Sequence, residues 1–223
     1  MFSRLPTITR ALLIGNGALF LLQLLLGQST FAAFMLWPPS DMGFDPFSPG
    51  QNFQPWQLLT YGFLHGSFGH LLFNMLALYM FGAPLELTWG TRRFLAYYLI
   101  CVAGAGLCQL AVGWWTVSQG AAAYPTLGAS GGVFGLLLAY GMLFPNQRVM
   151  LLFPPIPMKA RTFVIVFGAL ELLLGFTGWQ PGVAHFAHLG GMLFGWLVIR
   201  YWRGQPPFRR RPPGGPSHLG RVK

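Results

Sequence analysis

The stretch at 127–135, LGASGGVFG, places four glycines around one serine, Ser130. These glycines form two pairs spaced by four residues, and such pairs let two membrane helices approach each other backbone to backbone. Gly191 and Gly195 repeat the same spacing near the end of the chain. The pattern therefore predicts that a helix over 128–144 packs closely against a second glycine-bearing helix.

The composition of the whole chain is that of a membrane protein. Of the 223 residues, 54% are hydrophobic and only 8% are charged, whereas soluble domains have about 25% charged residues. A helix needs about 17 to 25 apolar residues to cross a bilayer. The apolar runs predict an all-α bundle of six transmembrane helices, at about 11–26, 67–84, 94–115, 128–144, 162–176 and 183–202.

The distribution of positive charge predicts the topology of this bundle. The loops at 28–66, 116–127 and 177–182 contain no lysine or arginine. All fourteen basic residues fall on the other side of a six-span arrangement, namely Arg4, Arg10, Arg92, Arg93, Arg148, Lys159, Arg161, Arg200, Arg203, Arg209, Arg210, Arg211, Arg221 and Lys223. Because cytoplasmic loops carry the excess of basic residues, we expect both termini to be cytoplasmic. The net charge of +10 thus indicates topology and contact with anionic lipid, not a nucleic-acid partner.

Four ranges of the chain have different expected structures. Residues 1–203 are expected to form one membrane domain, and 204–223 a disordered cytoplasmic tail rich in Pro, Gly and Arg. The loop at 28–66 is long for a connector, so a structured cap on the outer leaflet is expected, with a short interfacial helix near Trp56–Leu64. An alternative for residues 1–26 is a cleaved signal peptide, which leaves the downstream topology unchanged.

Polar residues gather at one depth of the predicted bundle. Ser67 is placed to cap the second span, which puts His70 and Asn74 on one face of its first turns. Ser130 begins the fourth span and His188 lies near the start of the sixth. These spans all run from outside to inside, so their four polar side chains are expected to meet near the outer surface. Polar groups inside a membrane usually mark a functional site.

The residue types in this cluster are those of a serine hydrolase. A serine hydroxyl becomes a nucleophile when a neutral imidazole removes its proton, so Ser130 and His188 are predicted to form a catalytic dyad. The backbone N–H of Ser130, the Asn74 amide and His70 are expected to bind the oxyanion. An alternative for Ser130 is a hydrogen bond to a carbonyl of its own helix, and Gly-x-x-x-Gly pairs alone indicate only packing.

The remaining ionisable residues are expected to have structural roles. The four carboxylates are Asp41, Asp45, Glu86 and Glu171, and none is placed clearly enough to complete a triad. Glu86 and Glu171 are interpreted as buried hydrogen-bond acceptors, and His65 and His185 as hydrogen-bonding partners beside the site. Zinc binding by histidines is the alternative, but no cysteine or carboxylate is expected to join them, so neither metal nor cofactor is predicted. Cys101 and Cys108 are expected to be free thiols within one span.

Three motifs in this order resemble the rhomboid family of intramembrane serine proteases: HGSFGHLLFN at 65–74, GASGGVFG at 128–135 and AHLGGMLFG at 187–195. The resemblance covers roughly residues 55–200. It implies a minimal six-helix bacterial form with Ser130 as nucleophile and His188 as base. It also implies an oxyanion hole of His70, Asn74 and the Ser130 backbone.

The resemblance carries further expectations. Gly128 and Gly191 match small positions beside the catalytic residues, and Phe73 matches a position near a substrate gate between the second and fifth spans. The implied partners are transmembrane proteins, cut near the outer face after a small residue. Separately, no Arg- and Ser-rich amphipathic transit segment is visible in the sequence, so the expected location is the bacterial cytoplasmic membrane, with the site opening outward. A stable helix hides its carbonyls, so a substrate must unwind before attack. The sequence makes no prediction about oligomeric state.

Two other classes of function remain as alternatives. A catalytically silent relative would bind transmembrane clients, although the presence of all four site residues argues against it. A channel or transporter can also gather polar groups at one depth, but transporters tend to show internal repeats and interrupted helices at the midplane. No such repeat is evident in this sequence.

Overall fold

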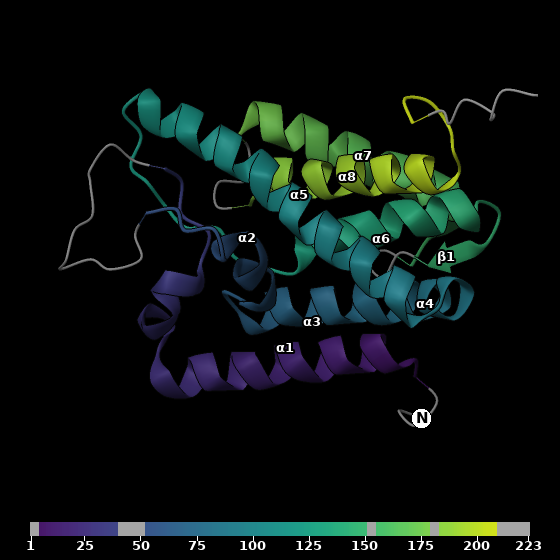
Figure 1. Ribbon diagram of the computed structural model, residues 1–223, viewed down its shortest axis with the longest axis horizontal. Helices are drawn as coiled ribbons and strands as arrows, with labels where there is room; N and C mark the ends of the chain where they lie inside the picture. The colour runs from purple at the N-terminus through teal and green to yellow at the C-terminus, as the bar shows by residue number, and fades with distance from the viewer. Residues whose placement is uncertain (1–4, 40–51, 151–154, 179–182, 209–223) are drawn as a thin grey trace, which may run out of the picture.

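The computed structural model describes residues 5–39, 52–150, 155–178 and 183–208, and it is mostly helical. Its long helices run roughly side by side, with α1 at one edge of the bundle and α5 slanting across the others (Figure 1). The N-terminal end of α1 and the C-terminal end of α8 lie at the same end of the bundle (Figure 1). The tail beyond residue 208, which was predicted to be disordered, lies outside the described residues.

The first two long helices differ from their predicted bounds for identifiable reasons. α1 covers Thr7–Leu26 and begins directly after Pro6, since proline is well tolerated at a helix start. α3 (Phe68–Ala77), η4 (Leu78–Gly82) and α4 (Ala83–Trp89) form one continuous rod. The predicted span ended at about 84, but the helix continues past Pro84, directly after the π turn of η4, and a widened turn can accommodate a proline ring. The rod ends instead at Gly90, whose φ is 79°.

The remaining long helices follow their predicted positions to within a few residues. They are α5 (Thr91–Ser118), α6 (Ser130–Leu143), α7 (Ala160–Thr177) and α8 (His185–Trp202). Between α6 and α7 the chain forms an antiparallel pair of short strands, β1 (Arg148–Met150) and β2 (Pro157–Lys159). The all-α prediction missed this hairpin, because three-residue strands are too short to show an alternating pattern.

The segment between α1 and α3 is structured where it is described. It contains η2 (Gln28–Phe34), α2 (Gln57–Thr60) and η3 (Tyr61–Phe63), so the short helix expected near Trp56–Leu64 is confirmed. The Trp56 indole donates a hydrogen bond to the Ala33 carbonyl at 2.9 Å. Leu36 and Thr126 exchange two backbone hydrogen bonds, which ties this segment to the loop before α6.

The centre of the bundle is the packing of α8 against α5 and α6. A Cβ atom on Gly191 of α8 would collide with the backbone carbonyl of Gly131 on α6, and one on Gly135 would approach the Gly191 carbonyl to 3.1 Å. The predicted backbone-to-backbone contact of these helices is therefore confirmed at Gly191. Gly195 was expected in the same contact, but a Cβ atom at this position would meet Tyr97 and Cys101 of α5.

Buried polar groups also hold the helices together. Tyr97 of α5 donates a hydrogen bond to the Gly135 carbonyl at 2.8 Å. The buried Glu86 carboxylate accepts hydrogen bonds from the backbone N–H groups of Ile8 and Thr9 at 2.9 and 2.7 Å, so it caps the start of α1. The structural role expected for Glu86 is confirmed, and an acidic side chain at a helix N-terminus also interacts favourably with the helix dipole.

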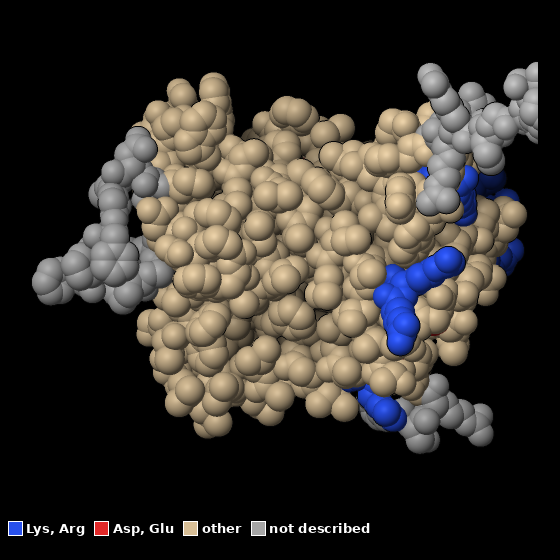
Figure 2. Space-filling model, in the orientation of Figure 1, with Lys and Arg blue, Asp and Glu red and all other residues tan. Residues whose placement is uncertain are grey.

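Among the residues that the structure describes, four helical segments are long and apolar enough to cross a membrane: Thr7–Leu26, Phe68–Trp89, Thr91–Ser118 and Ala160–Thr177. α6 is apolar but has only 14 residues, and α8 includes two histidines and Arg200, which lower its hydropathy. On the face drawn in Figure 2, the lysine and arginine side chains gather at one end of the molecule. This is the end at which α1 begins and α8 ends (Figure 1).

We expect Gly191→Ala to destabilise the protein by about 1–3 kcal/mol, a range typical of overpacked cores. The added methyl group would meet the backbone of α6, which cannot move as a side chain can. Thermal unfolding of the purified protein in detergent measures the effect. Gly15→Ala in α1 is the matched control, because its added Cβ has no neighbour within 4 Å among the described residues. Equal midpoints for the two variants would contradict the prediction.

Candidate active site

The hydroxyl of Ser130 and the ring of His188 are in hydrogen-bond contact. Ser130 is the first residue of α6, and His188 lies in the first turn of α8. The distance from Ser130 Oγ to His188 Nε2 is 2.7 Å. This contact follows from the helix packing, because the Gly191 contact with α6 lies one turn further along α8 from His188. A serine and an imidazole at this distance have the geometry of an activated nucleophile and its base.

An aromatic ring restricts the orientation of this imidazole. The ring of Phe134, one helical turn after Ser130, stacks on His188 with centroids 4.3 Å apart and planes 5° apart. Sequence analysis did not single out Phe134. The only available signal was its position four residues after Ser130, which places it on the same face of the helix.

His70 and Asn74 face the same cavity as Ser130 and His188. The predicted cap is present, since Ser67 Oγ accepts a hydrogen bond from the His70 N–H at 3.2 Å. Asn74 lies one turn deeper, as expected, and its amide donates a hydrogen bond to the His70 carbonyl at 2.9 Å. Because an amide nitrogen carries two hydrogens, the second one can serve an oxyanion in the cavity.

The turn before α6 brings its backbone against His70. Gly128 has a φ of 136°, which side chains other than glycine rarely adopt, and its Cβ would lie 2.6 Å from the His70 ring. Glycine is therefore required at this position for two separate reasons, its backbone conformation and the close ring. The supporting role expected for Gly128 is consistent with this geometry.

The cavity has a volume of about 870 Å³ and lies between α3, α6, α7 and α8. Its polar lining includes the site residues named above, and most of its lining is apolar, including Leu137, Phe163 and Phe167. Phe73 of α3 also lines it and is 58% exposed. An aromatic side chain that is both exposed and part of the lining is suited to the gate position expected for Phe73.

The two supporting histidines differ in what they contact. The buried ring of His65 lies edge-on to the His70 ring, with centroids 5.2 Å apart. Its backbone N–H donates a hydrogen bond to Gln23 of α1 at 3.0 Å, so α1 helps to position the segment that leads into α3. His185 instead contacts Glu171 of α7, and its ring centroid is 6.4 Å from that of His188.

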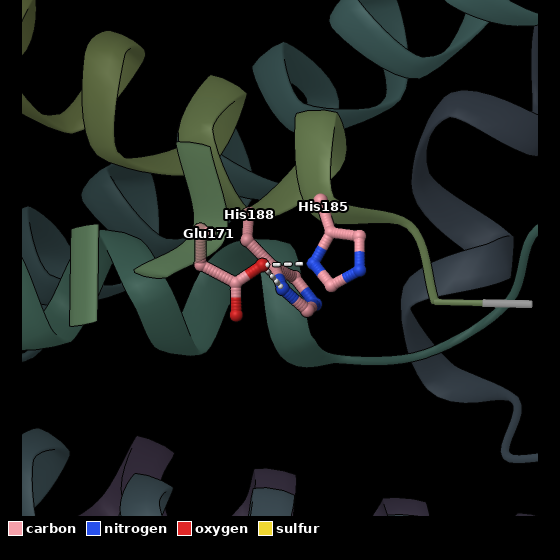
Figure 3. Close-up of side chains that lie close together, drawn as sticks. All are labelled: Glu171, His185 and His188. Carbon is pink, nitrogen blue, oxygen red and sulfur yellow. Dashed lines mark hydrogen bonds and ion pairs between the residues drawn. The ribbon is translucent and has the colours of Figure 1, made fainter. Parts of the chain in front are cut away.

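Glu171 lies much closer to the site than the sequence suggested. Its Oε2 is 2.7 Å from Nδ1 of His185 and 2.9 Å from Nδ1 of His188, so one carboxylate oxygen contacts both rings (Figure 3). The prediction that no carboxylate joins these histidines is therefore wrong. Hydropathy placed Glu171 in the fifth predicted span. It does not show which face of that span packs against the sixth span, because this depends on how the helices pack.

The same three side chains are a possible set of metal ligands. Glu171, His185 and His188 each offer one ligand atom, and these atoms lie within 4.8 Å of one another. Direct contacts at 2.7 and 2.9 Å between the oxygen and the two nitrogens are those of hydrogen-bonded or ion-paired groups. Cys101 and Cys108 are free, as expected.

These observations define an integral multi-pass membrane protein with a serine and a histidine in contact beside an apolar cavity. The sequence profile of the rhomboid domain matches residues 52–204. The chain therefore belongs to the rhomboid family.

Named relatives agree with this assignment. The chain is 33% identical over 151 residues to "Rhomboid protein 1, mitochondrial" of Saccharomyces cerevisiae, an alignment covering 62% of this chain and 40% of the yeast protein. It is 31% identical over 143 residues to "Rhomboid protease GluP" of Bacillus subtilis, covering 64% of this chain and 25% of that one. With "Putative rhomboid protease YdcA" of the same bacterium it shares 31% identity over 149 residues, covering 66% and 67%.

The environment of His65, which precedes α3, predicts a dependence of stability on pH. Burial, together with the nearby His70 ring, lowers the pKa of the His65 imidazole from 6.5 to about 4. The unfolded chain then binds this proton at higher pH than the folded chain does. The contribution of neutral His65 to stability is thus fully present above about pH 6.5 and is lost as the pH falls toward 4.

We therefore expect the thermal midpoint to fall between pH 6.5 and 4, and less steeply in His65→Gln than in the wild type. Thermal unfolding in detergent across this range measures the slope, and His65→Phe checks that the effect comes from losing a titratable group. A slope that is the same in all three proteins would show that His65 does not contribute.

Proposed function

We propose that this chain is an intramembrane serine endopeptidase that hydrolyses peptide bonds in or near transmembrane segments of other membrane proteins. The observation that carries the proposal is the 2.7 Å contact between Ser130 Oγ and His188 Nε2 in the lining of a mostly apolar cavity. Membership of a family with relatives named proteases supports it.

The proposed reaction begins with attack of Ser130 Oγ on the substrate carbonyl while His188 Nε2 takes the hydroxyl proton. The negative charge that develops on the carbonyl oxygen is stabilised by the Ser130 N–H, His70 and the Asn74 amide. His188 then gives its proton to the leaving nitrogen, and water hydrolyses the acyl-enzyme by the same route. In this scheme the dyad needs no cofactor or metal.

The apolar cavity is suited to a transmembrane substrate. A segment leaving the bilayer as an unwound chain would place its side chains among apolar residues such as Leu137 and Phe167, while its exposed carbonyls meet the polar site residues. In this proposal, the Phe73 side chain controls substrate entry between α3 and α7.

The proposed membrane arrangement has six spans in a single domain at 1–203, with the tail 204–223 on the cytoplasmic side. The basic residues at one end of the bundle (Figure 2) support cytoplasmic termini under the positive-inside rule. Ser130 begins α6, whereas Arg148 follows its other end, so the site would open toward the opposite, outer side. We propose a bacterial cytoplasmic membrane as its location.

Ser130→Ala and His188→Ala should each abolish cleavage of a transmembrane model substrate by purified protein in detergent, because each removes one half of the dyad. A fluorophosphonate probe should label the wild type at Ser130 and should not label Ser130→Ala. Both variants are expected to keep the wild-type thermal midpoint to within a few degrees. Cleavage that persists in Ser130→Ala would overturn the proposed nucleophile, and an inert but substrate-binding wild type would indicate a client-binding protein.

Asn74→Ala should lower kcat by about 10²–10³-fold with little change in KM, the usual cost of losing one oxyanion donor. Steady-state cleavage kinetics on the same substrate measure both constants. Asn16→Ala is the matched control, because Asn16 is also buried and also donates to its own helix, at Leu12, but lies in α1. A similar loss of kcat in the two variants would mean that Asn74 acts through folding alone.

A further inference from the structure

Glu171 is placed to act on the proposed base through the nitrogen that faces away from Ser130. The two ring nitrogens of His188 have different partners: Nε2 lies 2.7 Å from Ser130 Oγ, and Nδ1 lies 2.9 Å from Glu171 Oε2. We propose that Glu171 is a positioning residue that sets the tautomer and orientation of His188. This inference rests on the proposed function and extends the dyad to a Ser130–His188–Glu171 triad.

The proton balance of the cluster requires one particular tautomer. An ionised carboxylate only accepts hydrogen bonds, so the nitrogen beside it must carry the hydrogen. With the proton on Nδ1, the Nε2 lone pair of His188 faces the Ser130 hydroxyl, which is the arrangement that a base needs. The opposite tautomer would set the Nδ1 lone pair against a carboxylate oxygen 2.9 Å away, which is electrostatically unfavourable.

His185 holds the carboxylate in place. Its Nδ1 makes a hydrogen bond of 2.7 Å with the same Oε2 atom of Glu171, and the three side chains meet from two helices (Figure 3). The contact with His188 has an ion-pair distance but is not aligned as a hydrogen bond. Catalytic hydrogen bonds are often poorly aligned before substrate binds and tighten in the complex.

The carboxylate also acts during the reaction. When the Ser130 proton moves to Nε2, His188 becomes a cation in surroundings where the side chains of Glu171, His185 and His188 are at most 12% exposed. A carboxylate next to that cation stabilises it strongly in such a low-dielectric place. The proton passes from Ser130 to His188 and then to the leaving nitrogen, so Glu171 stays ionised throughout.

A metal ion bound by Glu171, His185 and His188 would prevent His188 from acting as a base. Zinc needs each ligand atom at about 2.0–2.2 Å, so it would replace the direct contacts of Glu171 Oε2 with both histidines. Metal on Nδ1 of His188 would leave the proton on Nε2 and so remove the base. The observed contacts favour the positioning role, and metal binding becomes an outcome of the test.

The test compares Glu171→Gln with Glu86→Gln in the full chain, using cleavage kinetics, the rate of fluorophosphonate labelling of Ser130 and the thermal midpoint. The two variants are matched because Glu86 is also a glutamate of low exposure whose carboxylate contacts polar groups, but it contacts the start of α1. In serine proteases, replacing the triad aspartate by its amide lowers kcat about 10⁴-fold.

For Glu171→Gln we expect kcat to fall by at least about 10²-fold and labelling to slow in parallel. KM should stay within about twofold of the wild type, because Glu171 is not among the described residues that line the cavity. Glu86→Gln should lower the thermal midpoint while keeping kcat. Glu171→Asp, which keeps the charge, should recover part of the lost rate, a result that a purely structural role would not give.

The outcomes separate the two proposals. A wild type that neither cleaves substrate nor takes up the probe would overturn the proposed function. A reactive wild type with an equally reactive Glu171→Gln would overturn only the role of Glu171. If Glu171→Gln does not fold, His185→Gln replaces it and should slow labelling several-fold, and an unchanged rate would overturn the proposal. Wild-type activity that requires zinc and is lost with EDTA would also overturn it.

Discussion

The site depends on how closely α6 and α8 approach each other. Where Gly191 meets the Gly131 carbonyl, there is no room for even a methyl group. Lipid tails are as apolar as the side chains, so association of membrane helices relies on close packing and hydrogen bonds more than on the hydrophobic effect. Ser130 and His188 lie one turn or less from this contact, and their 2.7 Å separation is a consequence of it.

Buried hydrogen bonds supply the rest of the rigidity. Tyr97 donates to the Gly135 carbonyl and Tyr61 to the Val102 carbonyl, at 2.8 and 2.7 Å, so α5 is held to α6 and to the segment before α3. Gln23 fixes the backbone at His65. Polar groups away from water are costly unless they are paired, and each of these pairs joins segments distant in sequence, which keeps the helices in one register.

Much of the fold follows from the sequence because hydropathy, proline and glycine act locally. The positions of the long helices, the Ser67 cap and the short helix near Trp56 were predicted from such signals and are present. The predicted end of the second span, at about 84, was too early, because the helix continues through Pro84 to Trp89. The prediction also missed the hairpin of β1 and β2, because strands of three residues show no alternating pattern in the sequence.

The candidate site also combines features that the sequence predicts with features that depend on the tertiary structure. The sequence by itself determined which groups are present: a serine among glycines, two histidines three residues apart on one helix, and a histidine and an asparagine on another. Only the tertiary structure decided that Glu171 contacts both His185 and His188 and that Phe134 stacks on His188. The residue types and their spacing along a helix are local properties, whereas the face that α7 turns toward α8 depends on the packing of the whole bundle.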